Sequence, residues 1–334
     1  MVNYYVRRTA RVFVTVLAVM TATFGLIRLL PGGPFSQLRA SLLRQGVPAE
    51  QVNQQIQNLQ NIRPDAPLHI QYVDYMASVL QLDLGTSISY SAPVADILAR
   101  AVPWTVFIVV VSTVLMFAFG IVLGAVQAYW EGSKFDTIVS SISIAGMSVP
   151  FYVLAILLLL FFSYRWGLFP ASGTADPNID NTLSVAYFAS VINHAVLPVA
   201  AYTITGIGAQ ALAMRGNSIQ VLGEDFVKVA RLRGLSDGRI STRYVARNAI
   251  LPMYTGFLLL LGFRLGGTII LEQIFNYPGL GYYLFESLNA NDYPLMMGTF
   301  LIITVALVIG VYVADLTYSK IDPRISAGDS SEAY

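Results

Sequence analysis

The sequence predicts an all-α integral membrane protein with six transmembrane helices. Of its 334 residues, 55% are apolar and only 12% are charged, and the mean hydropathy is +0.62. A domain folded in water needs more polar side chains than this to cover its surface. Six apolar runs reach the roughly 20 residues that a helix needs to cross a bilayer core. The basic residues gather in alternate connections between these runs, as membrane topology requires.

The six predicted spans are taken in order along the chain. They cover approximately residues 11–30, 103–129, 138–164, 191–214, 252–271 and 295–316. The first run follows Arg7, Arg8 and Arg11 and resembles the basic start of a secretory signal, but no small-x-small cleavage site follows it. We therefore expect it to be retained as a span. Pro150 and Pro198, inside the third and fourth spans, are expected to kink them.

The distribution of charge predicts how these spans are oriented. Seven basic residues lie in the connection 215–251, namely Arg215, Lys228, Arg231, Arg233, Arg239, Arg243 and Arg247. The connection 271–294 carries Glu272, Glu286 and Asp292 and no basic residue. Because basic loops remain inside, we expect the basic connection, the short loop at Lys134 and both termini to be cytoplasmic.

This orientation divides the chain into four parts. Residues 1–30 form the cytoplasmic start and the first span, 31–102 an extracytoplasmic region, 103–316 a five-helix core and 317–334 a cytoplasmic tail. In the extracytoplasmic region, two apolar stripes recur at helical spacing: Ile70, Val73, Ala77 and Leu80, and then Val94, Ile97, Leu98 and Val102. We expect a small lid on the outer face, which does not exclude a docking surface for an external partner.

The basic connection reads as a helical hairpin. Leu222, Phe226, Val229 and Ala230 fall on one predicted helical stripe, and Glu224 lies four residues before Lys228, a pairing that stabilises a helix by about 0.2–0.5 kcal/mol. Gly234 is expected to end this helix. Ser236 is a candidate N-cap for a second helix that runs to Ala249.

Three arginines of the second helix are expected to share one face. Arg239, Arg243 and Arg247 are spaced four apart, so their charges repel one another by a few tenths of a kcal/mol per pair. Something anionic should lie opposite. On charge alone, lipid headgroups and an acidic soluble partner are both open.

Several segments together carry a resemblance to a known family. VARLRGLS followed by RxxxRNAILP is similar to the cytoplasmic loop signature of ABC importer permeases, in the form found in the dipeptide/oligopeptide/nickel permease family. QLDLGTSISYSAPV, SVPFYVLAILLL, YPGLGYYLFES and the closing DPRI also resemble that family's pattern, in its order. The resemblance covers essentially the full chain. Lys228, Val229 and Ala230 stand where the general signature has a Glu before two alanines, a departure that resembles the peptide branch.

The resemblance implies a fold, partners and a function. The fold would be that of a type I ABC importer permease, with an extracytoplasmic insertion between spans one and two. The chain would form half of the pathway for di- or oligopeptides, beside a second permease subunit, two ABC ATPase subunits and an extracytoplasmic substrate-binding protein in a prokaryotic cell membrane. Nickel chelates, glutathione or oligosaccharides are alternative cargoes of the same machinery, and the sequence does not choose among them.

The resemblance also assigns the coupling residues. A short helix near residues 236–243 would dock into a groove of the ATPase subunit. The candidate residues of this coupling loop are Glu224, Asp225, Lys228, Ala230, Arg231, Arg233, Gly234, Ser236, Arg239, Arg243 and Arg247.

The sequence contains few of the residues and motifs that catalysis or metal binding requires. No GxxxxGK[ST] motif occurs around its three lysines, so ATP and Mg²⁺ are expected on the partner subunits rather than on this chain. Cysteine is absent, and the two histidines, His69 and His194, lie far apart with no zinc-binding motif. We expect no catalytic site, no metal, no cofactor and no nucleic-acid partner.

Arg264 is predicted in the middle of the fifth span. A charge at that depth costs about 2.5 kcal/mol or more unless it faces protein or water. It is therefore expected to point inward, either as a pathway residue near anionic substrate groups or as an arginine satisfied by helix carbonyls. Two GxxxG pairs, Gly120/Gly124 and Gly262/Gly266, permit close helix contact either within the chain or between subunits.

Other classes of membrane protein fit less well. An ion-coupled secondary transporter normally keeps carboxylates inside its spans and is built from inverted repeats, whereas the interiors of these spans carry none and no repeat of three spans is visible. No serine elbow or membrane aspartate pair indicates an intramembrane protease. A scaffold that transports nothing remains an alternative.

Overall fold

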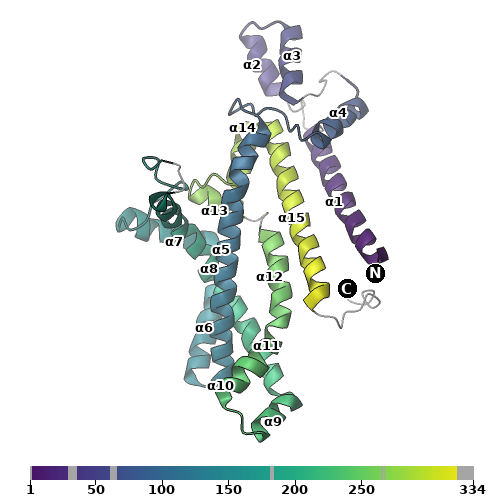
Figure 1. The fold of residues 1–334 in the computed structure, drawn as a ribbon. Coiled ribbons are helices and arrows are strands. Elements are labelled where there is room, and N and C mark those ends of the chain that lie inside the picture. The colour runs from purple at the N-terminus through teal and green to yellow at the C-terminus, as the bar shows by residue number, and fades with distance from the viewer. Residues whose placement is uncertain are drawn as a thin grey trace.

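The computed structural model describes residues 2–28, 36–60, 66–180, 184–264, 266 and 268–321. Within these residues the protein is helical, apart from one isolated bridge between Thr86 and Pro93. Two long helices, α5 (Val94–Tyr129) and α8 (Val185–Leu222), pack side by side and form the centre of the molecule. Beside them run α12 (Leu251–Arg264), α15 (Tyr293–Ile321) and α1 (Val2–Arg28), as Figure 1 shows.

Glycines bring the two central helices into close contact. A β-carbon at Gly120 would overlap the side chain of Gln210, and one at Gly124 would lie 2.8 Å from the Cβ of Met214 and collide with the carbonyl of Ala211. Without side chains at these positions, the backbones of α5 and α8 can approach each other. The Gly120/Gly124 pair therefore serves packing within the chain.

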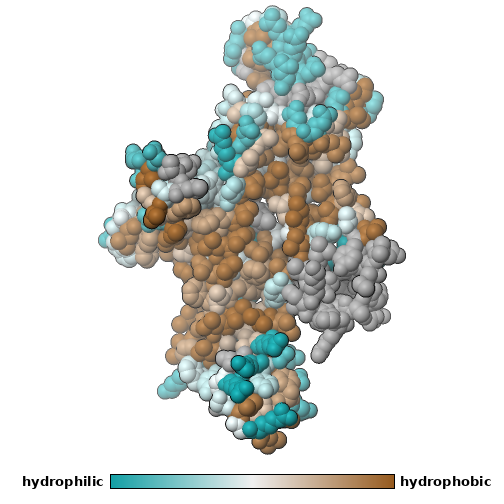
Figure 2. Space-filling model, in the orientation of Figure 1, coloured by the Kyte–Doolittle hydropathy of each residue, from teal (hydrophilic) through white to brown (hydrophobic). Residues whose placement is uncertain are grey.

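Five helices in the described residues are long and apolar enough to cross a membrane. They are Val6–Leu26, Val94–Tyr129, Val185–Leu222, Arg243–Arg264 and Tyr293–Val313. Figure 2 shows the result as a broad hydrophobic band between two hydrophilic ends. The second span begins nine residues earlier than predicted, because the stripe from Val94 to Val102 continues through Pro103 into one helix.

The third predicted span is not one continuous helix. Residues 138–164 fall on α6 (Lys134–Met147) and α7 (Phe151–Leu158), and α7 continues into a π-helical stretch, Leu159–Arg165. The two halves are bent by 93° at the break before Pro150. Proline lacks the N–H that would extend the helix and disfavours helical geometry at the preceding residue, so the expected kink becomes a break. Pro198, by contrast, lies inside a continuous α8.

The fifth predicted span is also wrong in its extent. The helix α12 ends at Arg264, and a separate short helix, α13 (Ile269–Ile274), follows. Arg264 is thus the last residue of α12 that the structure describes, and residues 265 and 267 of the predicted span lie outside the described residues. The acidic connection contains a further helix that was not predicted, α14 (Leu280–Ala290), which packs against α15.

The predicted lid is helical, and its last helix packs against α1 through aromatic residues. It consists of α2 (Ser36–Arg44), α3 (Ala49–Gln60) and α4 (Leu68–Leu80), which lie at one end of the molecule (Figure 1). In α4, Val73 and Leu80 are 62% and 81% exposed, whereas Tyr75 is buried against Phe24 of α1 with ring centroids 5.5 Å apart. Val73 and Leu80 are therefore open to the surface of the chain, and packing of the lid on the outer membrane face stays a prediction.

A buried carboxylate ties the lid connection to the last long helix. Asp292, just before α15, accepts hydrogen bonds from the Ser87 hydroxyl at 2.5 Å and the Ser89 N–H at 2.9 Å, and it also caps Leu295 N–H at 3.2 Å. The side chain is fully buried. The turn-rich segment before α5 is thus fixed against the start of α15.

Candidate functional site

The basic connection forms a compact helical hairpin at the end of the molecule opposite the lid (Figure 1). It begins where α8 ends at Leu222 and contains α9 (Asp225–Leu232), α10 (Asp237–Arg239), a π-helical turn (Ile240–Val245) and α11 (Ala246–Ala249). The connection is therefore shorter than the predicted 215–251, because α8 continues past Arg215.

Gly234 and Ser236 lie where the sequence predicted the hairpin to turn. Gly234 has φ +69°, a left-handed conformation that residues with a β-carbon rarely adopt. It follows the last turn of α9, as expected of a helix-ending glycine. The second helix begins after Ser236, whose carbonyl oxygen accepts hydrogen bonds from the N–H groups of Arg239 and Ile240, both at 3.0 Å. The predicted helix–turn–helix is confirmed.

The buried face of the hairpin differs from the predicted one. Val227, Ala230, Ile240 and Val245 are all buried and form one small apolar cluster. Phe226 and Val229 are 41% and 45% exposed, so the predicted stripe was displaced round the helix. Of the predicted stripe, Ala230 is buried in this cluster and Leu222 is partly buried against it. The cluster gives the hairpin a core of its own and leaves Phe226 and Val229 accessible.

The charged residues of the hairpin remain at its surface. The arginines Arg231, Arg233, Arg239, Arg243 and Arg247 are all exposed. Among the described residues, none of these five pairs with a carboxylate. Their positive charge is therefore uncompensated within the described part of the chain, which is the property required of a surface that binds an anionic partner.

One ion pair lies on α9, with a different acid from the predicted one. Lys228 Nζ lies 2.9 Å from Asp225 Oδ1, both side chains being exposed. This hydrogen bond lowers the pKa of Asp225 and raises that of Lys228. Glu224 instead occupies the extended N-cap position of α9, so the expected Glu224–Lys228 pair is replaced by Asp225–Lys228.

The hairpin is held to the spans by side chains at the end of α8. The Asn217 amide donates to the carbonyl oxygen of Ala249 at 3.2 Å. Arg215, counted as a loop charge in the sequence, lies within α8 and binds Asp136 of α6 through Nε at 2.6 Å and Nη2 at 2.7 Å. The sequence analysis missed Asp136. Its signal was the S-x-x-D spacing of Ser133 and Asp136, a capping arrangement at the start of α6.

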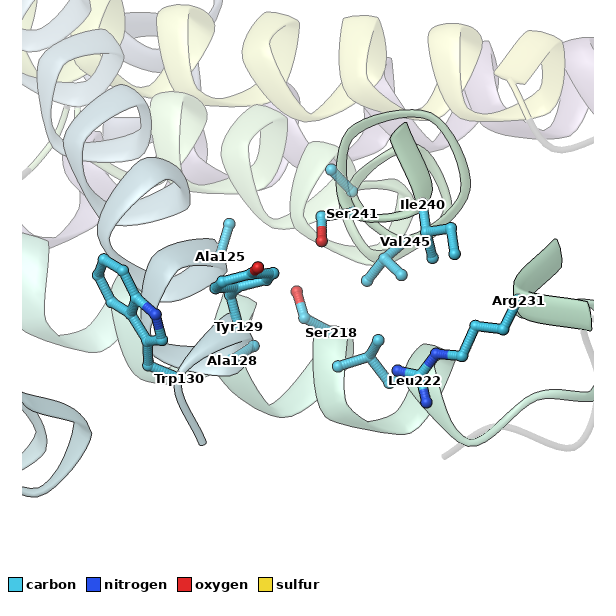
Figure 3. Close-up of a pocket in the computed structure, with 11 residues that line it drawn as sticks. Ala125, Ala128, Tyr129, Trp130, Ser218, Leu222, Arg231, Ile240, Ser241 and Val245 are labelled. Atoms are coloured by element: carbon cyan, nitrogen blue, oxygen red, sulfur yellow. The ribbon is translucent and has the colours of Figure 1, made fainter. Parts of the chain in front are cut away.

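A cavity of about 410 Å³ lies between the hairpin and the adjacent ends of α5 and α8. Its lining includes Tyr129 at the end of α5 and the C-cap residue Trp130, Ser218 from α8 and Arg231 from α9. In Figure 3 the hydroxyl groups of Ser218 and Ser241 face each other across it. The Oγ atom of Ser218 is buried and has no hydrogen-bond partner among the described residues.

Arg264, the second candidate site, packs against both central helices. Its guanidinium carbon lies 4.7 Å from the ring centroid of Tyr202, and Nη2 lies 3.4 Å from the sulfur of Met116. The Nη1 atom is buried without a hydrogen-bond partner in the described residues. Gly206 makes room for this arrangement, because a β-carbon there would overlap Met116 and lie 3.4 Å from Nη2. The guanidinium thus has an N–H group, at Nη1, that donates to no acceptor among the described residues.

Glu272 does not pair with Arg264. Its carboxylate is fully buried and accepts hydrogen bonds from the Thr105 hydroxyl at 2.8 Å and the Tyr282 N–H at 2.9 Å. It joins α13, α14 and the N-terminal part of α5, and it was predicted only as a loop charge. Its partners come from segments 167 and 10 residues away, so no local pattern reveals them.

Comparison with known proteins identifies the family. A family model described as "Binding-protein-dependent transport system inner membrane component" matches residues 119–327, which include most of the described spans and the whole hairpin. The chain belongs to this family. The resemblance drawn from the sequence motifs is therefore confirmed, and the protein is an inner membrane component with several membrane-spanning helices.

Its relatives in this permease family match along almost their full length. The dipeptide transport system permease protein DppB of Bacillus subtilis (strain 168) is 32% identical over 97% of this chain and 98% of the relative. The di/tripeptide permease DppB of Pseudomonas aeruginosa (strain UCBPP-PA14) and the glutathione permease GsiC of Pectobacterium atrosepticum are each 30% identical, over 97% of this chain and 99% of the relative.

One solved structure supports the fold. An inward-facing structure of the MetNI methionine ABC transporter matches with a TM-score of 0.53 and 17% identity, covering 68% of this permease and 96% of that chain. At this identity the similarity concerns the fold alone. The helical core is therefore that of an ABC transporter permease.

Proposed function

We propose that the chain is the transmembrane permease subunit of an ATP-driven ABC importer and forms half of the pathway for di- or oligopeptides delivered by an extracytoplasmic binding protein. The observation that carries the proposal is the near full-length match to permeases named for dipeptides, di/tripeptides and glutathione. Glutathione is itself a tripeptide, so these relatives favour short peptides over nickel chelates and oligosaccharides.

In this proposal the chain crosses the membrane six times. The bent pair α6–α7 makes the sixth crossing together with the five long helices. The hairpin lies in the cytoplasm and the lid outside. The start of α1 and the end of α15 then lie on the cytoplasmic side, in accord with the contact between Thr9 and Tyr312 at 3.1 Å.

The hairpin is the proposed contact for an ATPase subunit. It presents five arginines, without a carboxylate partner among the described residues, on a small folded unit that is anchored to α8 and continues into α12. Movement of such a unit would be transmitted to two spans together. A rigid-body switch of this kind is the general means by which ligand binding in one subunit reorients another. ATP and Mg²⁺ are bound by the partner in this scheme.

Arg264 is the proposed pathway residue. A guanidinium with an unused N–H in the hydrophobic band carries a desolvation cost that a carboxylate of a passing peptide would relieve. The alternative of a purely structural arginine rests on its contact with Tyr202.

Reconstitution tests the proposed function. The chain is placed in proteoliposomes with a second permease, two ATPases and a binding protein, and uptake of a labelled dipeptide is followed. The proposal predicts uptake that needs ATP and all partners. Uptake driven by an ion gradient without ATP would instead establish a secondary transporter.

A further inference from the structure

We propose that the cavity between the hairpin and the ends of α5 and α8 binds the phosphate-bearing headgroup of an anionic phospholipid. The cavity has a volume of about 410 Å³, within the range of small-ligand sites. The inference rests on the proposed function only for the side of the membrane on which the hairpin lies. Peptide transport plays no part in it.

The polar lining of the cavity fits a phosphate group. Arg231 supplies a guanidinium at its edge, and Ser218 and Ser241 supply hydroxyls that face each other across it (Figure 3). Guanidinium groups bind phosphate with paired, charge-assisted hydrogen bonds. A phosphate oxygen between the two serines would also give Ser218 the partner that it lacks within the described residues.

The charge around the cavity favours an anion. Asp136, the buried acid that α6 presents to α8, is neutralised by Arg215. Glu131 is exposed and does not line the cavity. Arg231 therefore supplies a positive charge that no lining carboxylate offsets.

The rim of the cavity favours a lipid over a soluble phosphate. Tyr129 and Trp130 are each 51% exposed at the end of a membrane-spanning helix. Aromatic residues with one apolar and one polar side are enriched where acyl chains meet headgroups. The hydrophobic band also ends at the level of the hairpin (Figures 1 and 2), so a headgroup can enter the cavity while its acyl chains remain in the bilayer.

Lipid binding to the assembled transporter in nanodiscs tests the inference. Bound phosphatidylglycerol is measured against phosphatidylcholine by native mass spectrometry for the unmodified complex and for Ser218→Ala, Arg231→Gln and the control Arg233→Gln. A charge-assisted hydrogen bond to phosphate is worth about tenfold or more in affinity. Ser218→Ala and Arg231→Gln should therefore each lower the preference for phosphatidylglycerol severalfold to about tenfold, whereas Arg233→Gln, whose side chain does not line the cavity, should leave it within about twofold.

Two further measurements keep the result interpretable. The Tm of Ser218→Ala is compared with that of the unmodified complex in each of the two lipids. If Ser218 binds no lipid, the variant should have an equal or higher Tm in both lipids. The proposal predicts instead that the variant loses the extra stabilisation that phosphatidylglycerol gives the unmodified complex. Glycerol phosphate is also added to phosphatidylcholine nanodiscs. Binding of this soluble phosphate as tight as that of the lipid, or an unchanged lipid preference in both cavity variants, overturns the assignment. Because ATP-dependent uptake is assayed separately, either result leaves the proposed transport function standing.

Discussion

The Asp136 carboxylate binds the Arg215 guanidinium through two hydrogen bonds and so joins α6 to α8 beside the hairpin. The acid is 5% exposed and the arginine 28%. Asp136 also accepts a hydrogen bond from the Gly132 N–H at 3.0 Å, which helps to orient the carboxylate toward Arg215. The end of α8 that carries the hairpin is thus fixed to α6 by an ion pair between residues far apart in the sequence.

Breaking this pair should destabilise the permease. Removing one partner from a buried ion pair costs about 3–5 kcal/mol, because the other charge stays buried. We expect Arg215→Met to lower stability by a value towards the lower end of that range, since the arginine is partly exposed. Thermal unfolding in detergent measures it, and Arg165→Met, an arginine outside the hairpin and α8, is the control. The double variant Asp136→Asn/Arg215→Met should recover part of the loss. If the double variant loses the sum of the two single effects, the pair makes no direct interaction.

Close packing of α5 on α8 predicts a sharp contrast between two glycines. Gly124→Ala should destabilise the protein by about 1–3 kcal/mol, because the added methyl group overlaps the backbone of α8. Gly146→Ala is the matched control: this glycine also lies in a helix, α6, and has open space around the added atom. Equal unfolding temperatures for the two variants would contradict the packing described here.

The turn of the hairpin offers a second pair of glycines. Gly234 has φ +69°, whereas Gly238 has no positive φ, and both have open space around them. Gly234→Ala should therefore cost about 1–2 kcal/mol of local stability through backbone strain alone, and Gly238→Ala should be neutral or slightly stabilising. Hydrogen exchange of the backbone amides of residues 225–249 reports this difference. Faster exchange in both variants, or in neither, would argue against a strained turn at Gly234.

A substitution of Arg264 distinguishes a role in the peptide pathway from a purely structural role. Arg264→Met keeps much of the side-chain volume and removes a buried N–H without a partner, so we expect the complex to assemble and to lose at most about 2 kcal/mol from the contact with Tyr202. If the guanidinium meets peptide carboxylates, uptake of a dipeptide should fall about tenfold or more, and uptake of its C-terminal amide should fall less. Arg28→Met, which removes an arginine 5.5 Å from the ring of Phe24, is the control. Equal losses for acid and amide would favour the structural role.

Local patterns predicted much of this fold. Apolar runs predicted the long helices, Gly234 the turn and Ser236 the start of the second hairpin helix, because each depends on residues a few positions apart. The buried face of α9 was predicted wrongly in part, since burial of Val227 depends on Ile240 and Val245 in the returning helical segment. Burial of Tyr75 in α4 depends on Phe24 of α1, which no local pattern reveals.

Long-range contacts explain the larger errors. The buried position of Glu272 depends on Thr105 and Tyr282, which local periodicity does not reveal. The break before Pro150 had a local signal, but a proline alone does not distinguish a kink from a 93° bend. The exposed arginines were read correctly as accessible charge, and their docking role remains a prediction.

The central claim is that the hairpin receives force from an ATPase subunit. The chain contains no cysteine, so Arg243→Cys introduces a single reactive thiol on the hairpin. Disulfide cross-linking to a cysteine on the ATPase in the assembled transporter measures the contact directly, and Arg44→Cys on α2, at the opposite end of the molecule, is the control. The account predicts an adduct for Arg243→Cys alone, together with loss of uptake that a reducing agent restores. No adduct from any hairpin position while ATP-driven uptake continues would contradict it.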